Sequence, residues 1–312
     1  MKKCLVTGGA GFIGSHLVER LVSEFIEIKV LDNLSSGLLE NLEPFQKHIA
    51  FKQGDVRDLS TLQEVMSGVE VVFHQAALVS VPQSIENPIE AAMINDFGTL
   101  NVLEAARHCG AKRVVFASSC AVYGDLPQLP KKEEMDTKPL SPYAASKLHG
   151  ENYARLYRDL YGLETVCLRY FNVYGPRQDP SSPYSGVISI FMSKAARGER
   201  VTIYGDGEQS RDFIYVADVV QANMLAAQRE NISGLTINVG TGKSVTVNSL
   251  WKNIAELAGV KGEPARANAR PGDIRQSVAE ISRANTLLDF EPRYSLEEGL
   301  QLTWEWYRSK SY

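Results

Sequence analysis

A glycine-rich turn near the N-terminus most constrains what this chain can fold into. Gly8, Gly11 and Gly14 have the spacing G-x-x-G-x-x-G, directly after the apolar residues 4–6 and directly before a segment with helical periodicity, residues 12–24. Between a strand and a helix, such glycines permit a tight turn in which the backbone closes on a pyrophosphate. The free N–H groups of the first helical turn then point at the phosphates. The turn therefore predicts a dinucleotide-binding unit.

An acidic residue lies at the distance that this interpretation requires. Residues 26–31 have the pattern of a buried strand, which ends on Asp32, about 20 positions beyond the glycines. A carboxylate there accepts hydrogen bonds from the adenosine ribose and repels a 2′-phosphate, and residues 33–36 contain no arginine. The expected cofactor is therefore NAD and not NADP.

Strand and helix patterns alternate through the first half of the chain. Five consecutive strand–helix units predict a parallel sheet with helices on both faces. After residue 171 the alternation breaks into proline- and serine-rich loops and short elements. We expect an α/β fold, a Rossmann-type doubly wound parallel sheet over residues 1–171, followed by a smaller mixed α/β substrate domain over residues 172–312. Segments of the second domain can return to the first.

Composition excludes several other classes of protein. The formal net charge is −4 and 22% of the 312 residues are charged, so nothing favours nucleic acid or an anionic membrane as a partner. The four cysteines are scattered, without a C-x-x-C pair, which argues against a metal site or a disulfide framework. The N-terminal apolar run is too short for a signal peptide. We therefore expect a cytoplasmic protein.

The strongest catalytic signal is a tyrosine and a lysine four residues apart. Tyr143 and Lys147 project from the same face of a helix expected over residues 141–160, so the ammonium group is expected to lower the pKa of the phenol and make it a general base. Lys147 can also bond the nicotinamide ribose. Ser119 ends the preceding strand, where an open α/β sheet binds its ligands, and its hydroxyl can relay a proton to Tyr143.

Other residues at strand ends are candidates for cofactor contact. Asp55 and Val56 could meet the adenine, and the small Ala76 and Ala77 let a ligand approach. His74, beside them, is expected to be a hydrogen-bonded structural residue and not a base. The full set of candidate cofactor contacts is Gly8, Gly11, Phe12, Ile13, Gly14, Asp32, Asn33, Asp55, Val56, Ala76, Ala77, Asn95, Tyr143 and Lys147.

Taken together, these motifs resemble the extended short-chain dehydrogenase/reductases. The segments that carry the resemblance are the glycine turn, Asp32-Asn33, the strand end at residues 118–124 and Tyr143 to Lys147. Within that superfamily, residues 169–177 (RYFNVYGPR), 211–214 (RDFI) and 270–273 (RPGD) look like the nucleotide-sugar epimerases.

The resemblance implies a substrate site and a reaction. It assigns Asn172 to a UDP diphosphate oxygen, Arg211 and Arg270 to cationic clamps, and Asp273 to the uridine ribose. The implied reaction inverts C4 of the sugar through a transient 4-keto intermediate, with a homodimer formed by the helices near residues 88–109 and 143–160. The candidate substrate contacts are Ser119, Asn172, Val187, Tyr204, Arg211, Arg270, Asp273 and Ser277.

Departures from the related patterns distinguish among relatives. Cys120-Ala121 replace the Asp-Glu pair of the 4,6-dehydratases, and Asp32 argues against an NADPH-dependent GDP-fucose synthase, which shares the Ser-Ser-Cys strand end. A UDP-glucuronate decarboxylase or another nucleotide-sugar short-chain dehydrogenase remains as an alternative, and so does a non-catalytic NAD-binding sensor. In the epimerases that the chain resembles, a residue shortly after the R-x-G-D motif walls the pocket beside the C2 substituent, and a bulky tyrosine there excludes N-acetyl groups. Ser277 stands at that position, so we expect UDP-GlcNAc and UDP-GalNAc as substrates, together with UDP-Glc and UDP-Gal.

Overall fold

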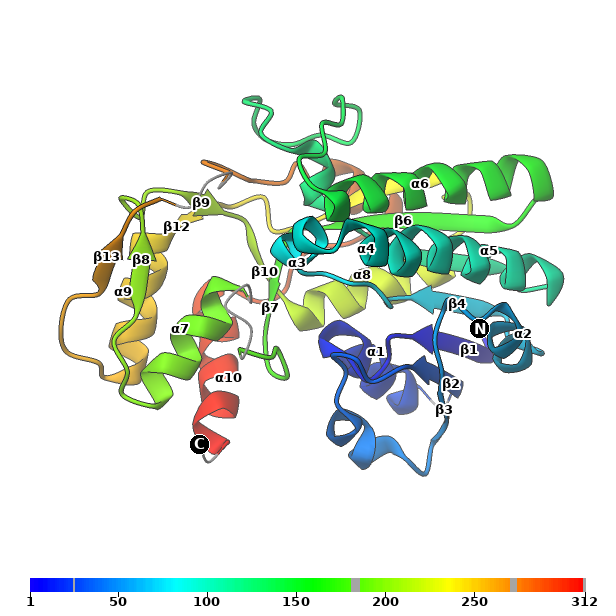
Figure 1. Ribbon diagram of the computed structural model, residues 1–312, viewed down its shortest axis with the longest axis horizontal. Coiled ribbons are helices and arrows are strands. Elements are labelled where there is room, and N and C mark those ends of the chain that lie inside the picture. Colours follow the sequence, from blue (N-terminus) through cyan, green and yellow to red (C-terminus); the bar gives the residue numbers. More distant parts are fainter. Residues whose placement is uncertain (25, 181–185, 270–273, 311–312) are drawn as a thin grey trace.

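The computed structural model describes residues 1–24, 26–180, 186–269 and 274–310, and it has two lobes (Figure 1). The larger lobe is built on a seven-stranded sheet with the strand order β11-β6-β5-β4-β1-β2-β3, in which all neighbouring strands are parallel. The strands are β1 (Lys3–Thr7), β2 (Glu27–Asp32), β3 (Ile49–Gln53), β4 (Val71–His74), β5 (Arg113–Ser119), β6 (Glu164–Tyr170) and β11 (Leu235–Val239).

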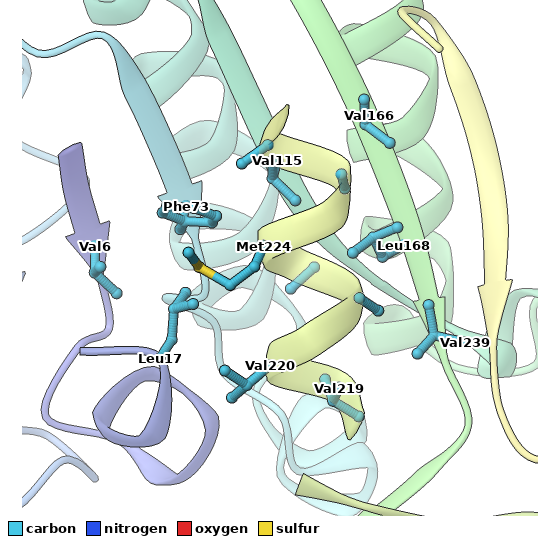
Figure 2. Close-up of a cluster of buried hydrophobic side chains, with 14 of the residues drawn as sticks. Val6, Leu17, Phe73, Val115, Val166, Leu168, Val219, Val220, Met224 and Val239 are labelled. Atoms are coloured by element: carbon cyan, nitrogen blue, oxygen red, sulfur yellow. The ribbon is translucent and has the colours of Figure 1, made fainter. Parts of the chain in front are cut away.

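Helices cover both faces of this sheet because consecutive strand residues point to opposite sides. Val6 packs with α1 and α8 on one face, whereas its neighbour Leu5 packs with α2, α5 and α6 on the other. Figure 2 shows the first of these cores, in which Met224 of α8 lies near Phe73 of the sheet. The doubly wound Rossmann-type fold is thereby confirmed. The helices are α1 (Phe12–Ser23), α2 (Leu59–Met66), α5 (Gly98–His108), α6 (Pro142–Tyr161) and α8 (Val216–Gln228).

The smaller lobe packs three helices around an aromatic core that includes Phe191, Trp251 and Trp304. Its elements are α7 (Val187–Ala196), α9 (Val247–Ala258), α10 (Leu296–Ser309) and the parallel pair β8 (Thr202–Tyr204) and β13 (Ala265–Ala267). Two further pairs are β7 (Asn172–Tyr174) with β10 (Phe213–Tyr215), which lies between the lobes, and β9 (Ser210–Arg211) with β12 (Val245–Thr246), which lies on the smaller lobe near β8 and α9. Although α8 and β11 follow residue 171, both belong to the larger lobe.

The helical segment expected over residues 88–109 is not uniform. It is preceded by α3 (Val81–Glu86) and consists of α4 (Pro88–Ala92), one wide π turn η2 (Met93–Phe97) and α5. Asn95 lies in the wide turn, where its side chain bonds both the N–H and the C=O of Leu78 at 2.8 and 3.0 Å.

Across all of the described ranges, no helix has the length and apolarity needed to cross a membrane.

Candidate active site

The glycine turn brings α1 against the end of β1. Gly8 has a φ of +70°, and a Cβ at Gly14 would lie 2.1 Å from the carbonyl oxygen of Gly8, so both positions require glycine. Gly11 precedes α1 without any side-chain cap, which leaves the N–H groups of the first turn, beginning with Phe12 and Ile13, available to an anion. This backbone fits the pyrophosphate of a dinucleotide.

The acidic strand end fits the adenosine side of the same ligand. Asp32 is buried, and its two carboxylate oxygens accept hydrogen bonds from the backbone N–H groups of Ala10 (2.9 Å) and Leu34 (2.8 Å). Burial raises the pKa of Asp32, and these two bonds oppose the rise. Because each carboxylate oxygen can accept a further hydrogen bond, Asp32 can still bind two ribose hydroxyls.

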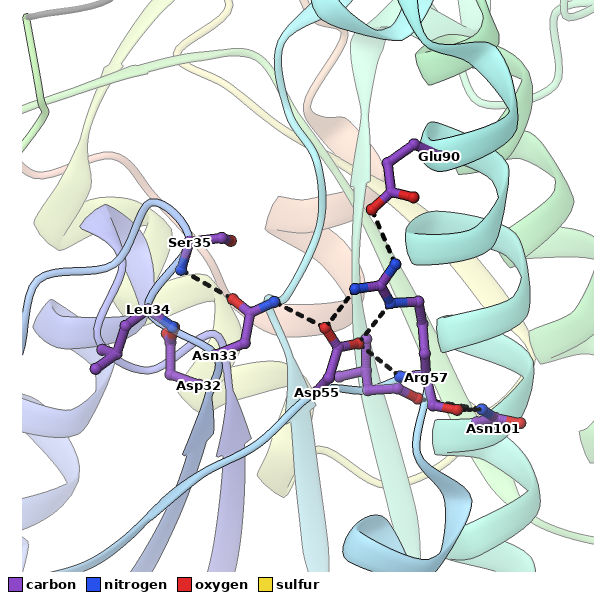
Figure 3. A network of polar contacts seen from close by, with 9 residues as sticks. Asp32, Asn33, Leu34, Ser35, Asp55, Arg57, Glu90 and Asn101 are labelled. Atoms are coloured by element: carbon purple, nitrogen blue, oxygen red, sulfur yellow. Dashed lines mark hydrogen bonds and ion pairs between the residues drawn. The ribbon is translucent and has the colours of Figure 1, made fainter.

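A polar network continues from Asp32 toward the expected adenine position (Figure 3). Asn33 donates to the Asp55 carboxylate at 2.9 Å, and Arg57 donates to both oxygens of that carboxylate at 2.8 and 2.9 Å. The Arg57 hydrogen bonds lower the pKa of Asp55 to about 2 despite its partial burial. Asp55 therefore stays ionised and fixed at neutral pH, while the adjacent Val56 is buried at the end of the same loop.

The three expected catalytic residues converge at the C-terminal ends of the central strands. Ser119 ends β5, and a hydrogen bond joins its side chain to the hydroxyl of Tyr143. Tyr143 and Lys147 lie on α6, whose N-cap Ser141 accepts from the N–H of Ala144. The Lys147 ammonium nitrogen lies 5.8 Å from the centroid of the Tyr143 ring and donates to the carbonyl of Ala117 at 2.8 Å.

The expected lowering of the Tyr143 pKa is wrong for this structure. Burial raises the pKa of Tyr143 to about 12, and the hydrogen bond with Ser119 opposes the rise only in part. Burial also lowers the pKa of Lys147 to about 8, which keeps most of the ammonium charged at neutral pH. Spacing on a helix predicts that the two groups lie close together, but it does not predict how deeply each is buried. Here the effect of burial on the Tyr143 pKa is larger than that of the nearby ammonium group.

His74 is the structural residue that the sequence suggests. Its ring is buried between the hydroxyls of Thr7 (2.8 Å) and Thr99 (3.0 Å). Burial, assisted by the positive charge of Lys147, lowers the pKa of His74 from 6.5 to about 3. The imidazole is therefore neutral in the folded protein, and its low pKa makes it a weak base at neutral pH.

This burial predicts a specific loss of stability in acid. The unfolded chain takes up a proton at His74 below about pH 6.5 whereas the folded chain does not, so stability falls as the pH drops toward 3. We expect the free energy of unfolding of the wild type to fall between pH 7 and pH 4 by roughly 3 kcal/mol more than that of His74→Asn. Chemical denaturation at both pH values measures the difference, with the exposed His48→Gln as control. Equal pH dependence in wild type and His74→Asn would refute the assignment.

The remaining cofactor candidates lie close to this centre. A Cβ at Gly8 would lie 2.7 Å from the backbone nitrogen of Ala76, which places the loop containing Ala76 and Ala77 directly against the glycine turn. The Asn95 amide also donates to the Ser146 hydroxyl on α6, at 3.1 Å. Its backbone partner Leu78 lies in the loop after β4, so Asn95 ties this loop to α6.

On the substrate side, the buried carboxylate of Asp212 holds separate loop segments together. This residue was not identified from the sequence. Asp212 is fully buried and accepts from the N–H groups of Thr241, Gly242 and Ala279 at 2.8–3.1 Å. The side-chain amide of Asn172 donates to the backbone carbonyl of Asp212 at 3.1 Å. The only sequence signal for this role is the position of Asp212 in the RDFI motif.

Ser277 lies beside the candidate catalytic residues. Its side chain forms a hydrogen bond with the thiol of Cys120, the residue after Ser119, and Cys120 is close enough to Tyr143 and Arg211 for their charges to influence one another. Arg211 pairs with Val245 of β12 and donates to the backbone carbonyl of Ser210 at 2.9 Å.

Other substrate candidates come from the smaller lobe. Val187 is the first residue of α7, and Tyr204 ends β8. Arg270 and Asp273 lie outside the described residues. The structure thus gathers Ser119, Tyr143, Lys147, Arg211 and Ser277 around one centre, next to the strand edge that holds the glycine turn.

Fold and site together define a Rossmann-type NAD enzyme with a serine, tyrosine and lysine at its centre. The family profile described as "NAD dependent epimerase/dehydratase family" matches residues 4–240. The chain belongs to this family of extended short-chain dehydrogenase/reductases, and its cofactor is NAD.

Relatives of known sequence or structure match nearly the whole chain. The chain is 42% identical over 309 residues to a putative UDP-glucose 4-epimerase of Methanocaldococcus jannaschii, covering 98% of this chain and 99% of the relative. Among solved structures, it is similar to a Thermotoga maritima UDP-glucose 4-epimerase with UDP-glucose (TM-score 0.94, 41% identity, 98% of each chain). It is equally similar to a Methanobrevibacter ruminantium UDP-N-acetylglucosamine 4-epimerase in complex with UDP-N-acetylmuramic acid (TM-score 0.95, 42% identity, 99% of each chain).

Proposed function

We propose that this protein is a UDP-sugar 4-epimerase that interconverts UDP-GlcNAc and UDP-GalNAc and also accepts UDP-Glc and UDP-Gal. The enzyme is an isomerase. The observation that carries the proposal is the convergence of Ser119, Tyr143 and Lys147 at the strand edge beside the glycine turn. Two solved relatives, named as epimerases of UDP-glucose and of UDP-N-acetylglucosamine, support the substrate class.

Each residue has a distinct part in the reaction. Tyr143 accepts the proton of the 4-hydroxyl, Ser119 bonds the same oxygen, and the Lys147 ammonium stabilises the phenolate. Bound NAD⁺ supplies the acceptor for the C4 hydride and a positively charged ring that also favours the phenolate. Asn172 and Arg211, with Arg270 outside the described residues, hold the UDP diphosphate while the 4-keto sugar turns its other face. Asp273, also outside the described residues, is proposed to bond the uridine ribose.

One experiment tests the reaction class. Purified protein is incubated with UDP-GlcNAc, UDP-GalNAc, UDP-Glc, UDP-Gal and UDP-glucuronate without added reductant, and the products are identified by NMR. We expect C4 epimers of the first four. Release of carbon dioxide from UDP-glucuronate would favour the decarboxylase, and NAD binding without any turnover would favour the sensor.

The small residue at position 277 is proposed to admit the N-acetyl group. Ser277 is 7% exposed and bonds the thiol next to the catalytic serine, so a larger side chain would have to enter the sugar site. We expect Ser277→Tyr to lower kcat/KM for UDP-GlcNAc about 100-fold, because overpacking costs 1–3 kcal/mol, while UDP-Glc is still turned over. Ser277→Ala is the matched control. An unchanged preference in Ser277→Tyr would reject the pocket assignment.

A homodimer through the α4 and α6 surface is proposed from a stripe of exposed apolar residues. Ile85, Ile89, Met93 and Phe97 recur every fourth residue, and Leu160 of α6 is also exposed. Ile89 is 79% exposed and Leu160 67%, which is a large apolar surface for a monomer to leave in water.

The cytoplasm remains the expected location, since all four cysteines are free thiols.

The dimer is tested by a charge in this stripe. We expect Ile89→Glu to halve the mass measured by light scattering after size-exclusion chromatography, because the dimer would bury the new carboxylate. Leu302→Glu, at an exposed apolar residue of α10, is the control and should leave the mass unchanged. A monomeric wild type would refute the proposal.

A further inference from the structure

A buried ion pair lies directly behind the catalytic residues. Glu151 of α6 and Arg169 of β6 are paired at 2.7 Å, with side chains only 7% and 5% exposed. The other Glu151 oxygen accepts from the Arg169 Nε at 2.8 Å and from the Ser118 hydroxyl at 2.5 Å. One carboxylate therefore connects α6 to both β5 and β6.

The pair continues the face of α6 that carries the chemistry. Tyr143, Lys147 and Glu151 follow one another at intervals of four residues, so they lie along one side of the helix. Lys147 bonds the carbonyl of Ala117, and Glu151 bonds the side chain of Ser118. The helix is thus attached to β5 at the two residues immediately before Ser119.

Arg169 extends the attachment to the segment after Ser119. Its guanidinium lies 4.7 Å from the ring centroid of Tyr123, which belongs to η3 (Cys120–Tyr123). The Tyr123 hydroxyl donates in turn to Asn238 of β11 at 2.7 Å. The strand end that carries Ser119 is therefore held on both sides by contacts of a single ion pair.

Stability alone is a weak explanation for such a pair. Taking two charges out of water costs several kcal/mol, and apolar residues of similar volume are often as stabilising. What an apolar pair lacks is the directional hydrogen bonding that fixes a helix against a strand. We propose that Glu151 and Arg169 are positioning residues that set the Tyr143 hydroxyl over Ser119, an inference that rests on the proposed epimerase function.

A second ion pair, between β5 and β6, provides a control. Arg113 and Glu164 face each other at the opposite ends of β5 and β6, paired at 2.5 Å, with Arg113 buried and Glu164 half exposed. Both pairs involve β6, which Glu151–Arg169 joins to α6 and Arg113–Glu164 joins to β5, but only the first lies at the catalytic edge. Loss of either pair affects stability, whereas only loss of the first should affect the reaction.

The test compares Glu151→Met/Arg169→Met with Arg113→Met/Glu164→Met. Each double variant removes both charges, so neither leaves an unpaired ion in the core. For the first we expect kcat to fall on the order of tenfold to a hundredfold, since misplacement by about 1 Å has this cost, with KM within about threefold and NAD retained. The control should keep the wild-type kcat. Equal kcat in the two variants, or a rise in KM alone, would overturn the proposal.

Crystal structures of the same variants separate this proposal from the proposed function. Displacement of the Tyr143 hydroxyl from Ser119 in the first variant and not in the control supports positioning, and an unmoved pair of hydroxyls overturns it. Absence of epimerisation by the wild type refutes the proposed function instead. If the double variant does not fold, Ser118→Ala provides a second test, because it removes one hydrogen-bond donor to Glu151 and keeps the ion pair. It should lower kcat less than the double variant does, again at constant KM. A wild-type kcat in Ser118→Ala would count against the proposal.

Discussion

Replacing Tyr143 by phenylalanine should reduce kcat about 1,000-fold, within the range that general acid–base groups contribute. The ring and its packing remain, because the only heavy atom lost is the hydroxyl oxygen that bonds Ser119. Because each factor of ten in rate corresponds to 1.36 kcal/mol, the change removes about 4 kcal/mol of transition-state stabilisation. NMR measurement of epimer formation gives the rate, and NAD released on denaturation gives the cofactor content, which should remain near that of the wild type.

The control for this variant is Tyr153→Phe. Tyr153 lies on the same helix, ten residues beyond Tyr143, and is only partly buried. It loses the same atom at a position away from the strand ends, so activity should be retained. If Tyr143→Phe kept more than about a tenth of the activity, the assignment of the proton acceptor would be wrong.

Introducing a methyl group at Gly14 should abolish NAD binding. In Gly14→Ala the new Cβ would lie 2.1 Å from the carbonyl oxygen of Gly8 and 2.8 Å from the Cα of Gly9. Both are backbone atoms, so no side-chain rotation relieves the clash, and the turn must open where the pyrophosphate is expected to bind. Purified variant should contain less than about a tenth of the wild-type NAD, with epimerisation reduced in proportion.

A substitution at the other end of the same helix shows whether this loss is local. Ser23 is the exposed last residue of α1, and Ser23→Ala should leave NAD content unchanged. Circular dichroism shows whether Gly14→Ala remains folded. Wild-type NAD content in folded Gly14→Ala would mean that the glycine turn is not the pyrophosphate site.

Local patterns predicted most of the larger lobe. The strand at residues 113–118 and the helix at 141–160 have unbroken apolar periodicity, so their positions could be predicted to within about two residues. The cofactor could also be predicted, since the glycine turn and Asp32 lie within one strand–helix–strand unit. By contrast, the return of β11 to the edge of the large sheet depends on pairing with β6, in which each residue pairs with one 69 positions earlier, as Leu235 does with Val166. Short-range patterns do not record such pairing.

The site shows the same division between local and distant information. Tyr143 and Lys147 share a helix, so their proximity follows from spacing. By contrast, the contact between Cys120 and Ser277 joins elements that are distant in the chain. The pKa of Tyr143 was predicted in the wrong direction because burial, which raises it, is a property of the whole fold.

The most direct test follows a deuterium atom placed at C4 of the preferred UDP-sugar. If the C4 hydride is removed and returned to the same carbon within one active site, the epimerised product keeps its deuterium at C4, and NMR shows no proton entering that position from water. Loss of the label to solvent would show that C4 inverts by proton exchange, and would contradict the mechanism proposed for Ser119, Tyr143 and Lys147.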